Sequence, residues 1–225
     1  MIRVFVGFDP REAVCYHVFC HSVARRTRRV VGFTPLKAEP LPGFNGRRDG
    51  SNDFIYSRFL VPTLCDFKGW AIYADGDMVC LADIEELWRL RDDRFAVMVA
   101  KHDYKTKQSV KYTGAANRDY PRKNWSSLIL WNGSHPANRA LTQAQVAAAS
   151  GAWLHGFKWL DDELIGSIPL EWNWIDTELP YNPEAKLVHY SLGAACFPGY
   201  EKTDHAHLWI AELQNLRTAE TVAHA

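Results

Sequence analysis

The chain has 225 residues, of which 47% are hydrophobic and 23% charged, a balance typical of one globular domain with a sizeable core. Its 26 Lys and Arg residues equal its 26 Asp and Glu residues, so the formal net charge is zero and no global field favours nucleic acid. No apolar run is long enough to cross a bilayer and no signal peptide is recognisable, so we expect a cytoplasmic protein whose five cysteines are reduced.

Strand and helix signals alternate from the start of the chain. Residues 2–8 have the apolar, β-branched character of a strand, which Asp9 and Pro10 end. Residues 11–25 then carry apolar side chains at helical spacing, and residues 30–33 predict a second strand. Arginines crowd the end of this first helix, where they suit the helix dipole, although contact with a membrane surface is an alternative.

The rest of the chain continues this alternation. In order, the sequence predicts a loop over residues 38–52, a helix over 54–64, a strand over 70–74, a helix over 83–88, strands over 95–100 and 127–131, helices over 137–149 and 157–168, and a strand over 186–190. The basic segment 101–124 lacks a clear period. It is either a solvated surface or a lid over a diphosphate or an anionic acceptor. With no repeat or linker, we predict one α/β domain over residues 1–216 and a frayed tail over 217–225.

Two carboxylates stand one residue apart at the end of the apolar strand over residues 70–74. Asp75 and Asp77 flank Gly76, which tolerates a positive φ and so permits a turn that points both carboxylates at one spot. Adjacent carboxylates repel, and a divalent cation removes that conflict. Oxygen ligands suit Mg²⁺ or Mn²⁺, which also hold phosphate oxygens. A solvent-exposed turn is the alternative, but the position after a core strand favours a metal site.

A series of short motifs occurs in a fixed order around and after this turn. They are YSRFLVP at 56–62, IYADGDMV at 72–79, DIEELW at 83–88, NWSSLILWN at 124–132, WLDDE at 159–163 and HYSLG at 189–193. The ordered set resembles glycosyltransferases of the GT-A fold, and among them the family 8 group of glycogenin-like and lipopolysaccharide galactosyltransferase-like enzymes. The resemblance runs from Asp9 to about Gly199. It implies a Rossmann-like GT-A domain with a mixed, mostly parallel central sheet flanked by helices.

The resemblance also implies the metal ligands. Asp75, Asp77 and His189 are expected to bind Mn²⁺ or Mg²⁺, and Asp75 is also expected to contact the donor. An imidazole joins carboxylates around Mn²⁺ more readily than around Mg²⁺. Judged without the motif, His189 would be a packed strand histidine.

Further positions are implied to bind the nucleotide-sugar donor. Gly7, Phe8 and Asp9 follow the first strand, where the family holds the nucleoside, although helix capping also explains Asp9. Arg58 is implied to contact the nucleotide or the donor sugar, with a surface arginine as the alternative.

The late part of the motif series departs from the family pattern. Gly193 belongs to the matching HYSLG stretch and is implied to contact the donor. The family's late lysine, which contacts the diphosphate, is missing, and Lys202 is the candidate replacement. Asp161 and Asp162 occupy the position of the family's catalytic stretch, near the reacting centre, although the dipole of a helix start also accounts for them.

The function implied is metal-dependent transfer of a sugar from a nucleotide-diphosphate sugar, with UDP the commonest nucleotide, to an acceptor hydroxyl with retention of configuration. The acceptor would be a glycan or a glycolipid, as in polysaccharide biosynthesis. Two alternatives stay open. One is a nucleotidyltransferase, against which the missing glycine-rich phosphate loop near residue 10 counts. The other is a catalytically silent protein that binds nucleotides or carbohydrates on the same scaffold.

Overall fold

The computed structural model describes residues 1–37 and 54–222, with side chains up to residue 218. Its centre is a six-stranded sheet in the order β2-β1-β3-β6-β5-β7. The strands are β1 (Ile2–Gly7), β2 (Val31–Leu36), β3 (Trp70–Ala74), β5 (Val97–Ala100), β6 (Leu128–Asn132) and β7 (Ile165–Ile168). Strand β6 runs antiparallel to both neighbours while the other pairs are parallel, so the sheet is mixed and mostly parallel, as predicted.

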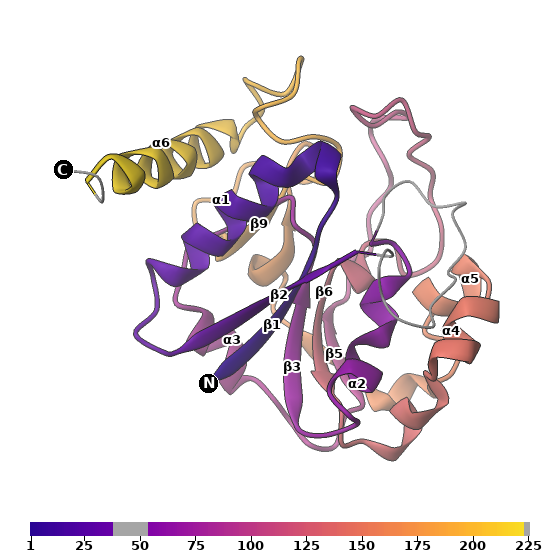
Figure 1. Cartoon of the computed structure of the whole chain (residues 1–225). Coiled ribbons are helices and arrows are strands. Elements are labelled where there is room, and N and C mark those ends of the chain that lie inside the picture. The colour runs from indigo at the N-terminus through magenta and orange to yellow at the C-terminus, as the bar shows by residue number, and fades with distance from the viewer. Residues whose placement is uncertain (38–53, 223–225) are drawn as a thin grey trace.

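A second, three-stranded sheet has the order β4-β9-β8. Its strands are β4 (Met78–Cys80), β9 (Leu187–His189) and β8 (Trp174–Ile175). The α-helices are α1 (Ala13–Ala24), α2 (Val61–Leu64), α3 (Ile84–Arg89), α4 (Gln143–Ala148), α5 (Gly151–His155) and α6 (Ala206–Val222). Helices α2, α4 and α5 lie on one side of the central sheet, and α1, α3 and α6 lie on the other (Figure 1).

Both faces of the central sheet are buried, which explains the continuous apolar runs of its strands. Along β3, Tyr73 packs in the cluster on the α2 side together with Phe59, and Ile72 packs in the cluster on the α1 side together with Phe19. A third cluster joins the outer side of α1 to the second sheet and to Trp209 of α6.

Three predicted helices differ from the structure. The helix over 54–64 is a 3-10 turn (Ser57–Leu60) followed by the short α2. The helix over 137–149 is broken into a 3-10 turn (Pro136–Ala140) and α4, because the Thr142 side chain caps a new helix start by accepting from the Gln145 N–H. The prediction of a helix over 157–168 is wrong, because the last residues of this range form strand β7, which pairs parallel with β5.

The spacing of Ile165 and Ile168 explains the last error. In a strand, residues three apart point to opposite faces, and these two side chains belong to the clusters on opposite sides of the sheet. In a helix the same spacing would place them on one face. Asp161 and Asp162 therefore stand at a 3-10 turn (Asp162–Leu164) before a strand.

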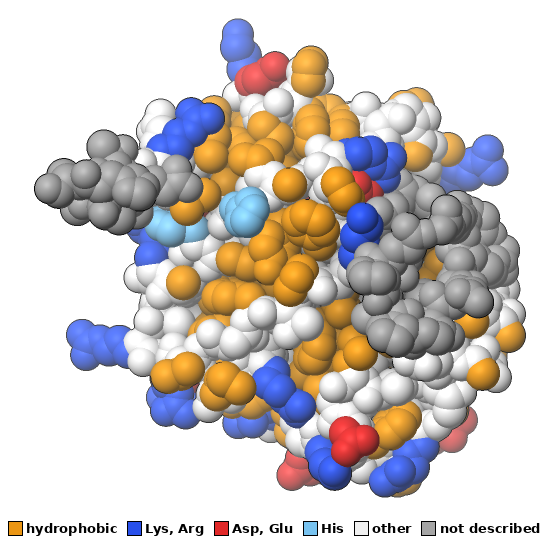
Figure 2. All heavy atoms as spheres, viewed as in Figure 1, with side chains coloured by type: hydrophobic (Ala, Val, Ile, Leu, Met, Phe, Trp, Pro, Cys, Tyr) orange, Lys and Arg blue, Asp and Glu red, His pale blue; other side chains and the backbone are white. Residues whose placement is uncertain are grey.

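The predicted loop over 38–52 lies outside the described residues. Helix α6 continues to Val222, so the proposed domain limit at residue 216 falls inside a helix, and that division stays a prediction. The five cysteines are free thiols. Within the described part of the chain, no helix is long and apolar enough to span a membrane. Lys and Arg side chains are scattered over the described face seen in Figure 2 and do not gather into one patch there.

Candidate metal centre

The turn between Asp75 and Asp77 lies at the carboxyl end of β3, beside the carboxyl end of the parallel strand β1. A Cβ atom on Gly76 would stand 2.4 Å from the carbonyl oxygen of Gly7, a distance that no other residue tolerates. The φ angle of Gly76 is not among the positive values, so tolerance of a positive φ, the expected reason for a glycine here, is not the actual one. Glycine is required because two backbones approach closely.

Strand pairing brings His189 to this turn. Strand β4 begins directly after Asp77 and pairs antiparallel with β9, so that Met78 lies opposite His189. The pairing continues one step further, where the Tyr190 N–H donates to the Asp77 carbonyl oxygen at 2.9 Å. Residues more than a hundred positions apart in the sequence thus share one corner of the second sheet.

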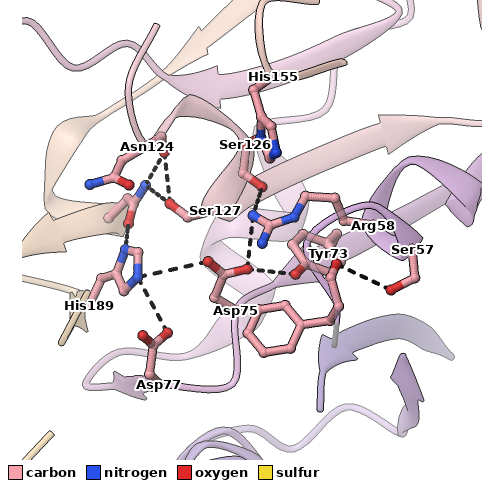
Figure 3. Close-up of polar contacts among 12 residues, drawn as sticks. Ser57, Arg58, Tyr73, Asp75, Asp77, Asn124, Ser126, Ser127, His155 and His189 are labelled. Carbon is pink, nitrogen blue, oxygen red and sulfur yellow. Dashed lines mark hydrogen bonds and ion pairs between the residues drawn. The ribbon is translucent and has the colours of Figure 1, made fainter. Parts of the chain in front are cut away.

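The side chains of Asp75, Asp77 and His189, here called the Asp–Asp–His cluster, point toward one another (Figure 3). His189 Nε2 lies 3.3 Å from Asp77 Oδ1 and 3.9 Å from Asp75 Oδ2. One ligating atom from each residue falls within 4.8 Å of the others. His189 and Asp75 are buried and the Asp77 side chain is 17% exposed, so a solvent-exposed turn does not describe the site.

Asn173 fixes which nitrogen of His189 faces the carboxylates. The amide nitrogen of Asn173 donates to the Asn124 carbonyl oxygen at 3.2 Å and to Ser127 Oγ at 2.9 Å. A carbonyl oxygen only accepts, so the amide oxygen of Asn173 must be the atom 3.2 Å from His189 Nδ1. Nδ1 therefore donates, and a neutral imidazole would turn the bare lone pair of Nε2 toward Asp75 and Asp77.

Asp75 is held by two buried partners. The Tyr73 hydroxyl donates to Asp75 Oδ1 at 2.5 Å, and Arg58 Nη1 lies 3.0 Å from the same oxygen. Arg58 also donates to the Ser126 carbonyl oxygen at 2.8 Å, and only 4% of the residue is exposed. The alternative of a surface arginine is therefore wrong. Its contact with a donor stays a prediction.

The two carboxylates have opposite pKa shifts. Burial raises the pKa of Asp75; the charge of Arg58 opposes this rise and the charge of Asp77 adds to it. Burial would also raise the pKa of Asp77, but a protonated His189, through its charge and its hydrogen bond, together with the charge of Lys111 outweighs this effect, so the net pKa is lowered. The site thus keeps Asp77 ionised and places its negative charge where a cation is favoured.

The arrangement fits a divalent cation. When the His189 ring is neutral, Asp77 Oδ1 is a buried oxygen without a hydrogen-bond donor among the described residues, and the lone pair of Nε2 faces the same point, where a cation would take the place of the ring proton. In an octahedral shell with bonds of about 2.1 Å, adjacent ligand atoms lie about 3.0 Å apart and opposite ones about 4.2 Å apart, and the two distances from Nε2 fall between these limits. Two carboxylates and one imidazole form a donor set for Mn²⁺, and Mg²⁺ would use the carboxylates.

The residues predicted to hold the nucleoside lie at the end of β1. Gly7 packs so closely under the Phe54 ring that a Cβ atom would stand 2.5 Å from it. Phe8 contacts the Tyr16 ring edge to face. Asp9 caps a 3-10 turn by accepting from the Arg11 N–H at 2.9 Å, so the capping role is confirmed, while its role toward a nucleotide stays a prediction.

The remaining predicted residues lie outside the Asp–Asp–His cluster. Asp161 and Asp162 are exposed, and Asp162 forms an ion pair with Arg122. Gly193 is buried, and a Cβ atom on it would stand 2.8 Å from the Tyr200 ring, so close packing accounts for this glycine. Lys202 is exposed. The roles assigned to these four residues stay predictions.

Sequence reasoning missed two residues that organise the site, Tyr73 and Asn173. Tyr73 belongs to an apolar strand, where an aromatic residue predicts core packing, and its hydroxyl gives no local signal. Asn173 stands between two tryptophans in LEWNWI and is 0% exposed. A polar amide inside an aromatic stretch was the available signal, because a buried amide needs hydrogen-bond partners.

Comparison with known proteins places this geometry in context. Protein CDI from Arabidopsis thaliana is 42% identical to the chain over 222 residues, 94% of this chain and 86% of that protein. The apo structure of the bifunctional glycosyltransferase WbbM matches with a TM-score of 0.65 and 15% identity, over 95% of this chain and 50% of WbbM. The galactosyltransferase LgtC, in complex with donor and acceptor sugar analogues, matches with a TM-score of 0.58 and 13% identity, over 95% of this chain and 96% of LgtC. No family model matches the chain.

The mixed sheet flanked by helices is therefore the fold of GT-A glycosyltransferases, which confirms the predicted fold class. The chain belongs to the same family as Protein CDI, because they share 42% identity along nearly the whole chain. It spans half the length of WbbM. At 15% identity or less, the solved structures establish the fold, and the activity has to be argued from the site.

Proposed function

We propose that the chain is a metal-dependent glycosyltransferase that moves a sugar from a UDP-sugar to an acceptor hydroxyl. The observation that carries the proposal is the Asp–Asp–His cluster at the carboxyl end of β3, where His189 Nε2 faces two carboxylates. Ligands of open α/β sheets bind at this edge. The motif resemblance supports membership of family 8, a retaining reaction and a glycan or glycolipid acceptor.

Asp75, Asp77 and His189 would hold Mn²⁺ or Mg²⁺. When bound, the ion supplies positive charge that neutralises a diphosphate as it leaves. Around it, Arg58 and Tyr73 fix the orientation of Asp75 through contacts of 3.0 and 2.5 Å. These contacts keep the carboxylate in place before a donor arrives, which lowers the cost of assembling the site.

The end of β1 is the proposed nucleoside site, because Gly7 touches Gly76 inside the turn and Phe8 and Asp9 follow directly. The charge of Lys111 acts on Asp77, so this lysine lies close enough to favour a bound diphosphate. Gly193 and Lys202 are proposed for the donor, and Asp161 and Asp162 for catalysis, on the motif resemblance alone. Assays of sugar transfer by the Asp161→Asn and Asp162→Asn variants test the proposed catalytic role, which predicts a loss of activity.

Calorimetry with UDP in the presence and absence of Mn²⁺ tests the function. We expect Mn²⁺-dependent binding in the native protein, no such binding for Asp77→Ala, and about 10–100-fold weaker metal affinity for His189→Ala. Asp204→Ala, at an exposed carboxylate outside the cluster, is the control and should bind normally. Unchanged binding by Asp77→Ala would refute the metal site.

Turnover separates the remaining alternatives. Incubation with UDP-sugars should release UDP, whereas a nucleotidyltransferase incubated with a nucleoside triphosphate and a sugar phosphate would release pyrophosphate. Tight Mn²⁺-dependent UDP binding with no hydrolysis or transfer from any UDP-sugar would indicate a silent binding protein instead.

A further inference from the structure

A cavity of about 530 Å³ opens beside the Asp–Asp–His cluster, between the segment 116–127 and helix α5. Asp75 and Arg58 line its inner end, where their charges are paired with each other. Its volume falls within the range of about 300–1,000 Å³ that is typical of small-molecule sites. The cavity is therefore large enough for a ligand beyond the metal ion.

Positive charge dominates the walls of this cavity. Lys111, Arg118, Lys123 and Lys158 line it, and Asp75 is the one carboxylate in its described lining. None of these four cations forms an ion pair with a carboxylate among the described residues. Four unpaired positive charges around one cavity contrast with the zero net charge of the chain and the scattered cations of Figure 2. Such a concentration favours a ligand that carries negative charge.

Lys111, Arg118 and Lys123 belong to the connection between β5 and β6, and Lys158 follows α5, so two segments of the chain bring their cations to one cavity. Lys123 is 9% exposed, and its amine donates to Asn117 Oδ1 at 2.6 Å and to the Arg118 carbonyl oxygen at 2.8 Å. Burial, together with the charge of Lys111, lowers the pKa of Lys123 to about 8, which leaves it mostly charged at neutral pH. Burying a charge costs free energy that an anionic ligand would offset.

Neutral groups in the same cavity suit a carbohydrate. Nε2 of His155 is buried without a hydrogen-bond partner in the described structure, while Nδ1 lies 2.7 Å from Ser126 Oγ (Figure 3). Burial, with the charges of Arg58 and Lys111, lowers the pKa of His155 to about 3, so the ring is neutral and one of its nitrogens keeps an unused hydrogen-bonding capacity beside the cavity. The Tyr120 ring is 45% exposed at the cavity wall, where it can stack on a sugar face.

We propose that this cavity binds the acceptor, and that the acceptor is a small carbohydrate carrying a phosphate or carboxylate group. This inference rests on the proposed transferase function, because the cavity adjoins Asp75, where the donor phosphates would lie. Lys111 is the cation whose charge acts on Asp77, so it serves the donor side. Arg118 and Lys158 are exposed side chains in the cavity lining and are assigned to the acidic group of the acceptor.

Calorimetry with glucose 6-phosphate, glucuronate and glucose, each with and without UDP and Mn²⁺, tests the inference. We expect at least one anionic sugar to bind tenfold or more tightly than glucose, since a hydrogen bond to a charged group is worth about tenfold or more. Comparing the phosphate with the carboxylate identifies the acidic group. The Arg118→Gln/Lys158→Gln double variant should lose this preference by about tenfold, while Lys107→Gln, at an exposed lysine on the same connection but outside the cavity lining, should keep it.

UDP–Mn²⁺ affinity, measured on the same samples, separates this inference from the proposed function. Normal UDP–Mn²⁺ binding with equal affinity for all three sugars would overturn the acidic acceptor alone. If the double variant instead lost UDP–Mn²⁺ affinity as strongly as sugar phosphate affinity, the cations would serve the donor diphosphate. If UDP-glucuronate bound more tightly than UDP-glucose and the variant removed the difference, the acidic group would belong to the donor sugar, and the assignment to the acceptor would be wrong.

Discussion

Replacement of Asn173 by leucine tests how the Asp–Asp–His cluster is held together. The Asn173 amide oxygen accepts from His189 Nδ1, and its nitrogen donates to the Asn124 carbonyl oxygen and to Ser127 Oγ. Leucine has a similar size but makes none of these bonds. The imidazole of His189 would then lose the contact that fixes its tautomer and its rotation.

The magnitude follows from the lost bonds. Removing an outer-shell partner of a metal-bound histidine costs about 10–100-fold in metal affinity, or roughly 1.4–2.7 kcal/mol. The variant also leaves His189 Nδ1 unpaired in a buried site, at about 1–3 kcal/mol. The Asn124 carbonyl oxygen still accepts from Ser127 Oγ at 2.7 Å. We therefore expect the free energy of unfolding to fall by roughly 1–3 kcal/mol, in addition to the weaker metal binding.

A second buried asparagine provides a matched control. Asn138 is also 0% exposed, and its amide nitrogen donates to the carbonyl oxygens of Ala96 and Asn132, at 2.8 Å each. Asn138→Leu should lower the free energy of unfolding by a similar amount, because Trp159 Nε1, which donates to Asn138 Oδ1 at 3.3 Å, loses its acceptor, but it should leave metal affinity unchanged.

Urea unfolding and calorimetry with Mn²⁺ and UDP separate the two effects. Asn173→Asp, which keeps an oxygen acceptor for His189 Nδ1, should retain more metal affinity than Asn173→Leu. Native metal affinity in Asn173→Leu, alongside lost affinity in His189→Ala, would refute the tautomer argument. Equal losses of metal affinity in Asn173→Leu and Asn138→Leu would show that general destabilisation is the cause.

Three further predictions concern other parts of the chain. Burial and the charge of Asp77 raise the pKa of Glu12 from 4.5 to about 7. The stability due to this shift is present below pH ~4.5 and lost as the pH rises through ~7, so the free energy of unfolding of the native protein should fall by up to roughly 3 kcal/mol between pH ~4 and ~8. Glu12→Gln should show a smaller fall in urea unfolding, and an equal fall in both proteins would contradict this. Gly76→Ala should lower Tm and Mn²⁺-dependent UDP binding, because its Cβ would meet Gly7 at 2.4 Å, and an unchanged Tm would exclude that clash. Asp83→Ala removes the cap that accepts from the Glu85 N–H, so urea unfolding should show a loss of about 1 kcal/mol with normal UDP binding; weakened UDP binding would show that this cap also supports the site.

Elements set by nearby residues could be predicted from the sequence. Strand β3 has the predicted limits Trp70–Ala74, and α3 begins after Asp83, whose side chain caps it. These features depend on interactions within one strand or one helical turn, so their signals are contained in a few consecutive residues. The same holds for the Asp75–Asp77 pair, whose position after an apolar strand indicated a site.

Features that depend on distant partners could not be predicted in this way. The apolar spacing at Ile165 and Ile168 fits a helix as well as a strand, and the pairing of β7 with β5 decides between them. His189 gave no local signal either and was found through a motif alone.

The sequence by itself determined where carboxylates follow a core strand, and the tertiary structure decided what surrounds them. Arg58 reaches Asp75, and Asn173 reaches His189, through contacts between elements that only the folded sheets bring together. Hydrogen bonds act over about 3 Å, so the partner of a buried polar group is chosen by the register of neighbouring strands, whatever the distance along the chain.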